Sequence, residues 1–149
     1  ILPNFHQISQ NDLIVLEISN RQLTIDLQHS PQIGILTNIH PNHLAEHGSY
    51  QKYQETKFNL FKYQTKQDTA VINYDNPIIK KNLSRFLGQQ IPFSLRKNLK
   101  NGLYIEKHQI YYQQKPWITY HNNYFNAPHN QANLLAALGA TLKFNLPSF

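Results

Sequence analysis

The sequence predicts an α/β fold in three layers, a mostly parallel sheet flanked by helices, with a small antiparallel β insertion at about residues 90–120. Short apolar runs alternate with helical segments up to about residue 86, and this alternation is typical of parallel sheets. Short strand-like segments separated by turn residues then replace it. A helix rich in Leu and Ala, from about Asn130 to Leu142, is the last clear element. We expect a single domain over residues 1–149.

Three apolar runs rich in β-branched residues predict buried strands. They are Asp12–Ile18 (DLIVLEI), Ile33–Ile39 (IGILTNI) and Thr69–Asn73 (TAVIN). The first two runs end in polar residues, namely Glu17, Ser19, Thr37 and Asn38. Because parallel α/β sheets bind ligands beyond the carboxyl ends of their strands, these polar residues mark a candidate site.

Helices and turns are expected between and after these strands. One helix should run from about Tyr50 to Tyr63, and another from Asn76-Pro77 to about Phe86, because proline is tolerated in a first helical turn. In the region that follows, Asn101-Gly102 is the strongest signal for a hairpin turn. Lys107-His108 and Lys115-Pro116 are expected to form further turns.

The composition excludes several classes of protein. A hydrophobic fraction of 40% argues against intrinsic disorder, and the absence of cysteine excludes disulfides and thiolate zinc sites. The net charge of +6 fits a solvated basic surface or a phosphorylated ligand. No stretch approaches the roughly 20 apolar residues of a membrane helix, and no signal peptide is visible. We expect a cytoplasmic protein that does not bind membranes.

Lys57 is the most informative anomaly in the sequence. At about 100° per residue, it projects from the same helical face as Tyr50, Tyr53, Leu60 and Phe61. A lysine in an apolar stripe usually extends its ammonium group to water. The alternative is that Lys57 lines a polar site beneath the helix, because a buried ammonium group is costly unless it is paired or chemically altered.

Histidines gather directly after the second predicted strand. His40, His43 and His47 fall within eight residues of one another. A lone histidine is more often structural, but a cluster at the carboxyl end of a strand favours a site, and such clusters are typical of transition metals. Glu17 supplies a carboxylate at the end of the preceding strand. Glu17, His43 and Lys57 could therefore converge on one ion.

Four segments together resemble the central domain of the Mur ligases. Residues Thr37–Ser49 (TNIHPNHLAEHGS) and then Tyr53–Lys57 (YQETK) are similar to the family pattern TN(I/L)xxDHLDxHGS followed by Tyr and Ala-Lys. Asn73–Pro77 (NYDNP) resembles N-x-D-D-P, and Ala127–Asn133 (APHNQAN) resembles G-x-H-N-x-x-N. The segments keep the order of the family and span most of the chain. The resemblance implies a truncated P-loop NTPase-like central domain.

A further segment points to one branch of this family. Leu16–Leu23 (LEISNRQL) resembles the LE(L/I)SSFQL of the D-glutamate-adding members. These join D-glutamate to UDP-N-acetylmuramoyl-L-alanine through an acyl phosphate, with cleavage of ATP to ADP and phosphate, in bacterial peptidoglycan synthesis. The alternatives are a diaminopimelate-adding, lysine-adding or folylpolyglutamate-forming relative, or a catalytically silent homologue.

The resemblance also implies roles for particular residues. Lys57 would be carbamoylated, which converts a cation into an oxygen donor suited to Mg²⁺. Glu17, His43 and Lys57 would form the catalytic metal site. The residues facing the muramoyl-alanine substrate would be Ser19, Gln22 and Asn38. Those on the ATP side, near the adenine, would be His129, Asn130 and Asn133.

Several positions depart from the family pattern. Asn42 and Ala45 replace aspartates, Asn20 and Arg21 replace Ser and Phe, and Ala127 replaces Gly. Asn42 is compatible with a working site. Arg21 and the altered DHLD motif support the silent homologue, and Arg21 and Ala127 bear on activity or the exact subfamily.

The chain contains no segment of the form G-T-N-G-K-(S/T), the loop with which this family grips ATP phosphates. We therefore expect that the N- and C-terminal domains of a longer enzyme are missing, and that this polypeptide alone does not ligate. A remaining alternative is a basic nucleic-acid-binding module that stacks bases on aromatic residues. Its candidates, Tyr104, Tyr111, Tyr112 and Trp117, are more often core residues, so we expect no nucleic-acid partner.

Overall fold

A computed structural model describes residues 7–10, 12–26, 28–41 and 48–144. Its six strands form one sheet in the order β1-β2-β3-β4-β5-β6. The strands are β1 (Ile33–Leu36), β2 (Thr69–Asn73), β3 (Gln89–Ser94), β4 (Leu103–Glu106), β5 (Gln109–Tyr112) and β6 (Lys115–Thr119). The first four strands pair in parallel, and β4, β5 and β6 pair antiparallel. The predicted mostly parallel sheet with an antiparallel part is therefore confirmed.

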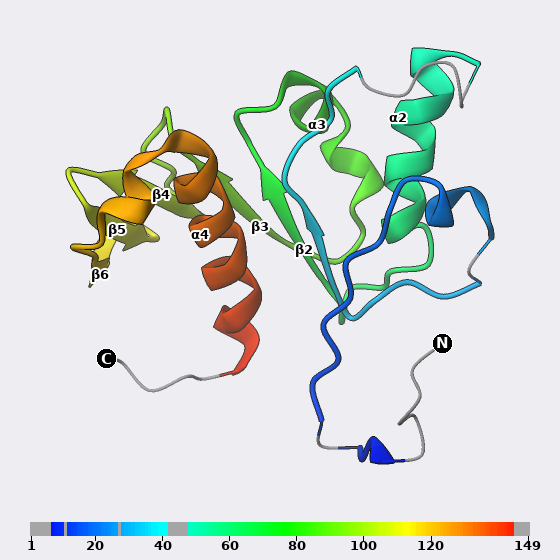
Figure 1. The fold of residues 1–149 in the computed structure, drawn as a ribbon, viewed down its shortest axis with the longest axis horizontal. Coiled ribbons are helices and arrows are strands. Elements are labelled where there is room, and N and C mark those ends of the chain that lie inside the picture. The colour runs from blue at the N-terminus through cyan, green and yellow to red at the C-terminus, as the bar shows by residue number, and fades with distance from the viewer. Residues whose placement is uncertain (1–6, 11, 27, 42–47, 145–149) are drawn as a thin grey trace.

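Helices cover both faces of this sheet (Figure 1). The α-helices are α2 (Tyr50–Phe58), α3 (Pro77–Lys81) and α4 (Pro128–Thr141). Short 3₁₀ turns are η2 (Gln22–Thr24), η3 (Asn59–Phe61), η4 (Leu83–Arg85), η5 (Asn123–Asn126) and η6 (Leu142–Phe144). Figure 1 shows α2 and α3 on one side of the parallel strands and α4 on the other, so the predicted three-layer arrangement is confirmed.

The alternation of side chains along β2 explains why both faces are covered. Ala70 and Ile72 belong to a core cluster with side chains of α2, η3 and α3, whereas Val71 belongs to a second cluster with Leu135 and Ala136 of α4. Ala70, Val71 and Ile72 are all 0% exposed. A strand whose neighbouring side chains are buried on opposite faces reads as a continuous apolar run, which is the pattern that predicted it.

The two helices that follow β1 and β2 begin at the expected residues. The Ser49 side chain accepts a hydrogen bond from the Lys52 backbone N–H (3.2 Å), and Asn76 Oδ1 accepts from Ile78 and Ile79 (both 3.1 Å). These caps satisfy N–H groups that a helix start leaves without partners. Both helices tighten into 3₁₀ turns, η3 and η4, instead of continuing as α-helix to Tyr63 and Phe86.

The prediction of a buried strand at Asp12–Ile18 is wrong. In the structure this segment forms neither helix nor strand, and Leu13 and Val15 are 65% and 84% exposed. An apolar run records a tendency to be buried, but a buried strand also needs elements that cover both of its faces. Residues 7–10, 12–26, 28–41 and 48–144 provide no such cover for Leu13–Leu16.

The expected hairpin turn at Asn101-Gly102 is also wrong, because β3 and β4 run parallel. Glycine is needed there for a different reason: a Cβ atom on Gly102 would lie 2.3 Å from the carbonyl oxygen of Pro92. The antiparallel part of the sheet therefore spans β4 to β6 rather than starting near residue 90.

The two hairpin turns of the antiparallel part carry left-handed residues that are not glycine. Lys107 and His108 have φ of 48° and 65°, and Gln113 and Gln114 have φ of 50° and 65°. Paired positive φ values are typical of the two-residue turns that match strand twist. The turn at Lys107-His108 is as predicted, whereas Lys115-Pro116 lies within the edge strand β6, where proline is tolerated.

The left-handed turn predicts a stabilising substitution. Gln114→Gly should raise the free energy of unfolding by about 0.5–1 kcal/mol, because glycine removes the steric cost of positive φ. The matched control is Lys115→Gly at the next position, which should lower it by about 0.5–1 kcal/mol because glycine weakens a strand. Urea unfolding monitored by circular dichroism measures both, and equal destabilisation by the two variants would contradict this explanation.

Candidate functional site

A groove of about 440 Å³ lies between residues 13–18 and the outer edge of β1. Its polar lining includes Glu17, Thr37, Asn38 and Lys57, and most of its other lining residues are apolar. Thr37 and Asn38 directly follow the carboxyl end of β1, which is where ligands bind in parallel α/β sheets. The structure thus brings together three of the residues that the sequence singled out: Glu17, Asn38 and Lys57.

Lys57 reaches this groove from the last turn of α2. Its side chain is half-buried, and its ammonium nitrogen lies 5.8 Å from the centre of the Tyr53 ring. Burial lowers the pKa of the Lys57 ammonium group, because removal from water disfavours its charged form. The amine is therefore neutral more often than that of an exposed lysine, and a neutral amine is the form that reacts as a nucleophile.

Side chains of the N-Y-D-N-P segment hold the loop that follows β1. Asn73 Nδ2 donates to the carbonyl oxygen of Thr37 (2.8 Å), and Asn76 Nδ2 donates to that of Ile39 (3.0 Å). Asn76 is only 5% exposed, so its amide has little access to water. The Thr37-Asn38 edge of the groove is therefore fixed by residues that come from the end of the neighbouring strand.

Asp75 makes the corresponding connection from β2 to β3. One of its carboxylate oxygens accepts from the Ser94 hydroxyl (2.6 Å), and the other accepts from the Leu95 backbone N–H (2.7 Å). Ser94, which is 0% exposed, accepts in turn from the backbone N–H groups of Arg96 and Lys97. Sequence reasoning did not single out Ser94, and its only signal was a small polar residue at the end of an apolar strand.

The candidate adenine-side residues lie at the same edge of the sheet. Lys143 Nζ donates to the Gln67 carbonyl oxygen just before β2 begins, so the C-terminal end of α4 lies over the amino ends of the strands. The N-terminal end of α4 therefore lies toward their carboxyl ends. His129 and Asn133 are exposed there, and Asn130 Nδ2 donates to the Tyr124 carbonyl oxygen (2.7 Å).

Ser19 and Gln22 do not line the groove. Instead they bond to each other just before η2: Gln22 Oε1 accepts from the Ser19 backbone N–H (2.8 Å), and Ser19 Oγ accepts from the Gln22 backbone N–H (3.3 Å). Both side chains are exposed beside this turn. Their role in substrate binding stays a prediction.

The metal site expected from Glu17, His43 and Lys57 is only partly visible. His43 and His47, like the departures Asn42 and Ala45, lie outside the described residues. In the part of the chain that the structure describes, no group of three or more His, Cys, Asp and Glu side chains is arranged to hold a metal ion. Glu17 and Lys57 share the groove, and the contribution of His43 stays a prediction.

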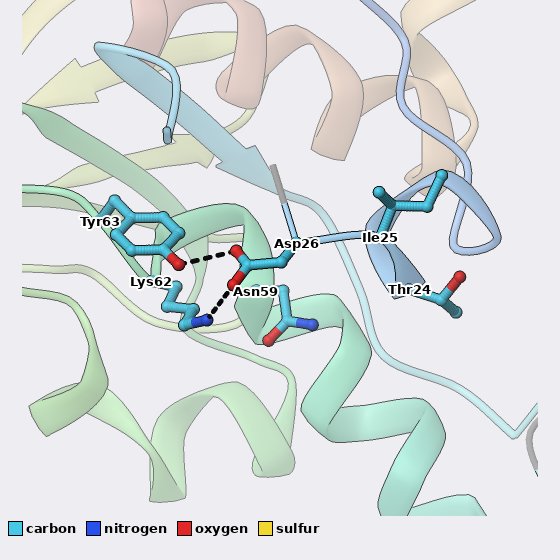
Figure 2. A pocket seen from close by; sticks show the side chains of 6 residues that line it. All are labelled: Thr24, Ile25, Asp26, Asn59, Lys62 and Tyr63. Carbon is cyan, nitrogen blue, oxygen red and sulfur yellow. Dashed lines mark hydrogen bonds and ion pairs between the residues drawn. The ribbon is translucent and has the colours of Figure 1, made fainter. Parts of the chain in front are cut away.

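A second hollow, of about 240 Å³, lies between residues 24–26, which follow the segment that carries Glu17, and the residues that follow α2 (Figure 2). Asp26 accepts hydrogen bonds there from the Tyr63 hydroxyl (2.7 Å) and from Lys62 Nζ (3.0 Å). These hydrogen bonds lower the pKa of the Asp26 carboxyl to about 2, and the bond from Tyr63 has the larger effect. Asp26 is therefore ionised at neutral pH. Sequence reasoning missed this cluster, because its members are far apart in the chain.

The whole arrangement is that of a known family. Residues 4–141 match the model of the Mur ligase middle domain, and the chain belongs to this family. It is 33% identical over 144 residues to a UDP-N-acetylmuramoylalanine--D-glutamate ligase of Alkaliphilus oremlandii. This alignment covers 94% of the chain and 32% of the relative. It is 36% identical over 127 residues to the ligase of the same name from Caldanaerobacter subterraneus. That alignment covers 85% of the chain and 28% of the relative. The chain thus spans about a third of the length of these relatives.

Solved structures agree on the fold. A MurF ligase from Thermotoga maritima in complex with ADP superposes on 80% of the chain with a TM-score of 0.57 and 18% identity. A UDP-N-acetylmuramoyl-L-alanyl-D-glutamate--2,6-diaminopimelate ligase superposes on 87% with a TM-score of 0.67 and 22% identity. The chain covers 29% of each of these proteins. Within the described ranges, no helix has the length and apolar character needed to cross a membrane.

The buried hydroxyl between β2 and β3 predicts a measurable loss. Ser94→Ala should lower the free energy of unfolding by about 1–3 kcal/mol, because Asp75 and two backbone N–H groups lose a buried partner. Ser84→Ala, at an exposed position in η4, is the control and should change it by less than about 0.5 kcal/mol. Chemical denaturation measures both values. Similar values for the two variants would show that the bonds of Ser94 do not hold the strand ends together.

Proposed function

We propose that this chain is the central, nucleotide-handling domain of an ATP-dependent, ADP-forming ligase of peptidoglycan synthesis, which adds D-glutamate to UDP-N-acetylmuramoyl-L-alanine in the cytoplasm. The observation that carries the proposal is the half-buried Lys57 in a groove with Glu17 and Asn38, at the carboxyl end of β1. The names of the curated relatives support the choice of D-glutamate.

The donor groups of the groove fit Mg²⁺ on one condition. Glu17 and Asn38 offer oxygen atoms, which Mg²⁺ prefers, whereas an ammonium group would repel it. The lowered pKa of Lys57 favours the neutral amine, which can attack CO₂, lose a proton and become a carbamate anion. Carbamoylated Lys57 and Glu17 would then hold the ion, with His43 as a further ligand. Bound Mg²⁺ supplies charge compensation for phosphate groups.

The proposed reaction has two steps. The carboxylate of the muramoyl-alanine substrate attacks the γ-phosphorus of ATP, so that an acyl phosphate forms and ADP leaves. The amine of D-glutamate then attacks the acyl carbon, phosphate leaves, and an amide bond forms with loss of one proton. Asn38 and the segment Ser19–Gln22 would orient the substrate, whereas His129, Asn130 and Asn133 at the start of α4 would face the adenine.

This chain supplies only part of such a site. It contains no G-T-N-G-K-(S/T) segment, whose backbone amides and lysine would hold the phosphates. We therefore expect no ADP release from the 149-residue chain alone with ATP, Mg²⁺ and both substrates. Turnover by the pure chain would contradict this part of the proposal.

The decisive substitution is at Lys57 in the full-length protein. Lys57→Ala should lower kcat about 100-fold or more, because it removes a group that stabilises charge during phosphoryl transfer. Lys52→Ala, an exposed lysine on the same helix, is the matched control and should leave kcat unchanged. ADP release is measured with D-glutamate, meso-diaminopimelate or lysine as the amine. Activity that does not depend on Lys57, or that prefers another amino acid, would contradict the proposal.

A further inference from the structure

Glu17 and Lys57 lie on two separate pieces of the chain. Lys57 belongs to α2, whereas Glu17 belongs to the exposed segment 12–18, which forms no strand. A groove between two such pieces keeps its shape only if the pieces are fixed to each other. The contacts that follow Glu17 in the sequence therefore decide how far it lies from Lys57.

The chain after Glu17 is attached to the end of the helix that carries Lys57. Leu23 is 2% exposed, and its carbonyl oxygen accepts from Asn59 Nδ2 (3.0 Å). Three residues further on, Asp26 accepts from Lys62 Nζ and from the Tyr63 hydroxyl, as Figure 2 shows. Asn59 begins η3, which directly follows α2, and Lys62 and Tyr63 come directly after η3. Both attachments therefore reach the turn that continues the helix carrying Lys57.

The Tyr63 contacts extend this attachment to the other side of Asp26. The Tyr63 backbone N–H donates to Ser30 Oγ (3.0 Å), and the Gln28 backbone N–H donates to Asp26 Oδ1 (3.2 Å). The Lys62–Asp26 ion pair is about half exposed, with side-chain exposures of 49% and 56%. Exposed pairs of this kind contribute little to stability. We therefore expect the Lys62–Asp26 pair to affect the position of the chain more than the free energy of unfolding.

We propose that Asp26, Lys62 and Tyr63 form a clamp that positions the segment carrying Glu17 against the helix carrying Lys57. Asp26 is a positioning residue, since it lines the second hollow and not the groove. Its loss leaves the Leu23–Asn59 contact to hold this segment, which can then rotate about Leu23 and move Glu17 relative to Lys57. The structural part of this inference is independent of the proposed function, whereas its effect on catalysis rests on that function.

The structural part is tested by a distance measurement in this chain. The sequence contains no cysteine, so spin labels attach only where cysteine is introduced. Val15→Cys near Glu17 and Lys52→Cys on α2 place labels at two exposed positions, and pulsed electron paramagnetic resonance gives the distribution of distances between them. Asp26→Asn and Tyr63→Phe should broaden this distribution or shift its mean.

The matched control for the clamp is Glu55→Gln. It breaks the ion pair between Glu55 of α2 and Arg85 of η4 (2.7 Å), whose partner lies outside segment 12–26. Glu55→Gln should leave the label distance unchanged. An unchanged distribution in Asp26→Asn and Tyr63→Phe, or the same change in Glu55→Gln, would overturn the proposal.

The catalytic part is tested in the full-length protein. Asp26→Asn and Tyr63→Phe should each lower kcat about tenfold, because small displacements of catalytic groups slow reactions strongly. The KM for ATP should stay within about twofold, because the adenine-side residues lie on α4. Equal loss of kcat in Glu55→Gln would show general destabilisation and overturn the proposal. If the wild-type protein does not ligate D-glutamate, the proposed function fails while the distance measurement still decides the clamp.

Discussion

The carboxyl ends of three parallel strands are held in register by side chains from the end of β2, and the candidate site depends on this constraint. Asn73 and Asn76 bind the backbone that follows β1, and Asp75 binds Ser94 and the backbone that follows β3. Parallel strands meet at one edge, where their connections leave backbone groups to be satisfied. Here Asn73, Asp75 and Asn76 satisfy those backbone groups, and the two asparagines fix the loop that contains Thr37 and Asn38 beside the groove.

The position of Lys57 follows from this framework. Phe58 and Phe61 pack against β1 and β2, and this packing fixes the orientation of α2. In that orientation Lys57 lines the groove instead of extending into open water. The half-buried amine is unfavourable for an ammonium group and suitable for one that is converted to an anion. A lysine in an apolar helical face thus marks the candidate site, and the carbamate that we propose would give a chemical reason for it.

The sequence predicted the elements whose own residues determine them. Thr69–Asn73 carries its own pattern of burial, and the caps at Ser49 and Asn76 are local, so the strand and both helix starts were predicted correctly. Asp12–Ile18 failed because burial depends on other elements that cover the run. Asn101-Gly102 failed because its glycine serves a close contact with Pro92 rather than a turn.

The candidate site was predictable where motif and position agree, as for Glu17, Asn38 and Lys57, and not where distant residues meet, as for Asp26 and Tyr63.

The central claim is that Lys57, as a carbamate, shares one divalent cation with Glu17. The most direct measurement is ¹³C nuclear magnetic resonance of the full-length protein in ¹³C-bicarbonate with added Mn²⁺. We predict a protein-bound carbamate signal that is absent in Lys57→Arg, and whose broadening by Mn²⁺ is weakened in Glu17→Gln. The absence of a carbamate signal, or a signal that Mn²⁺ leaves sharp, would contradict the account.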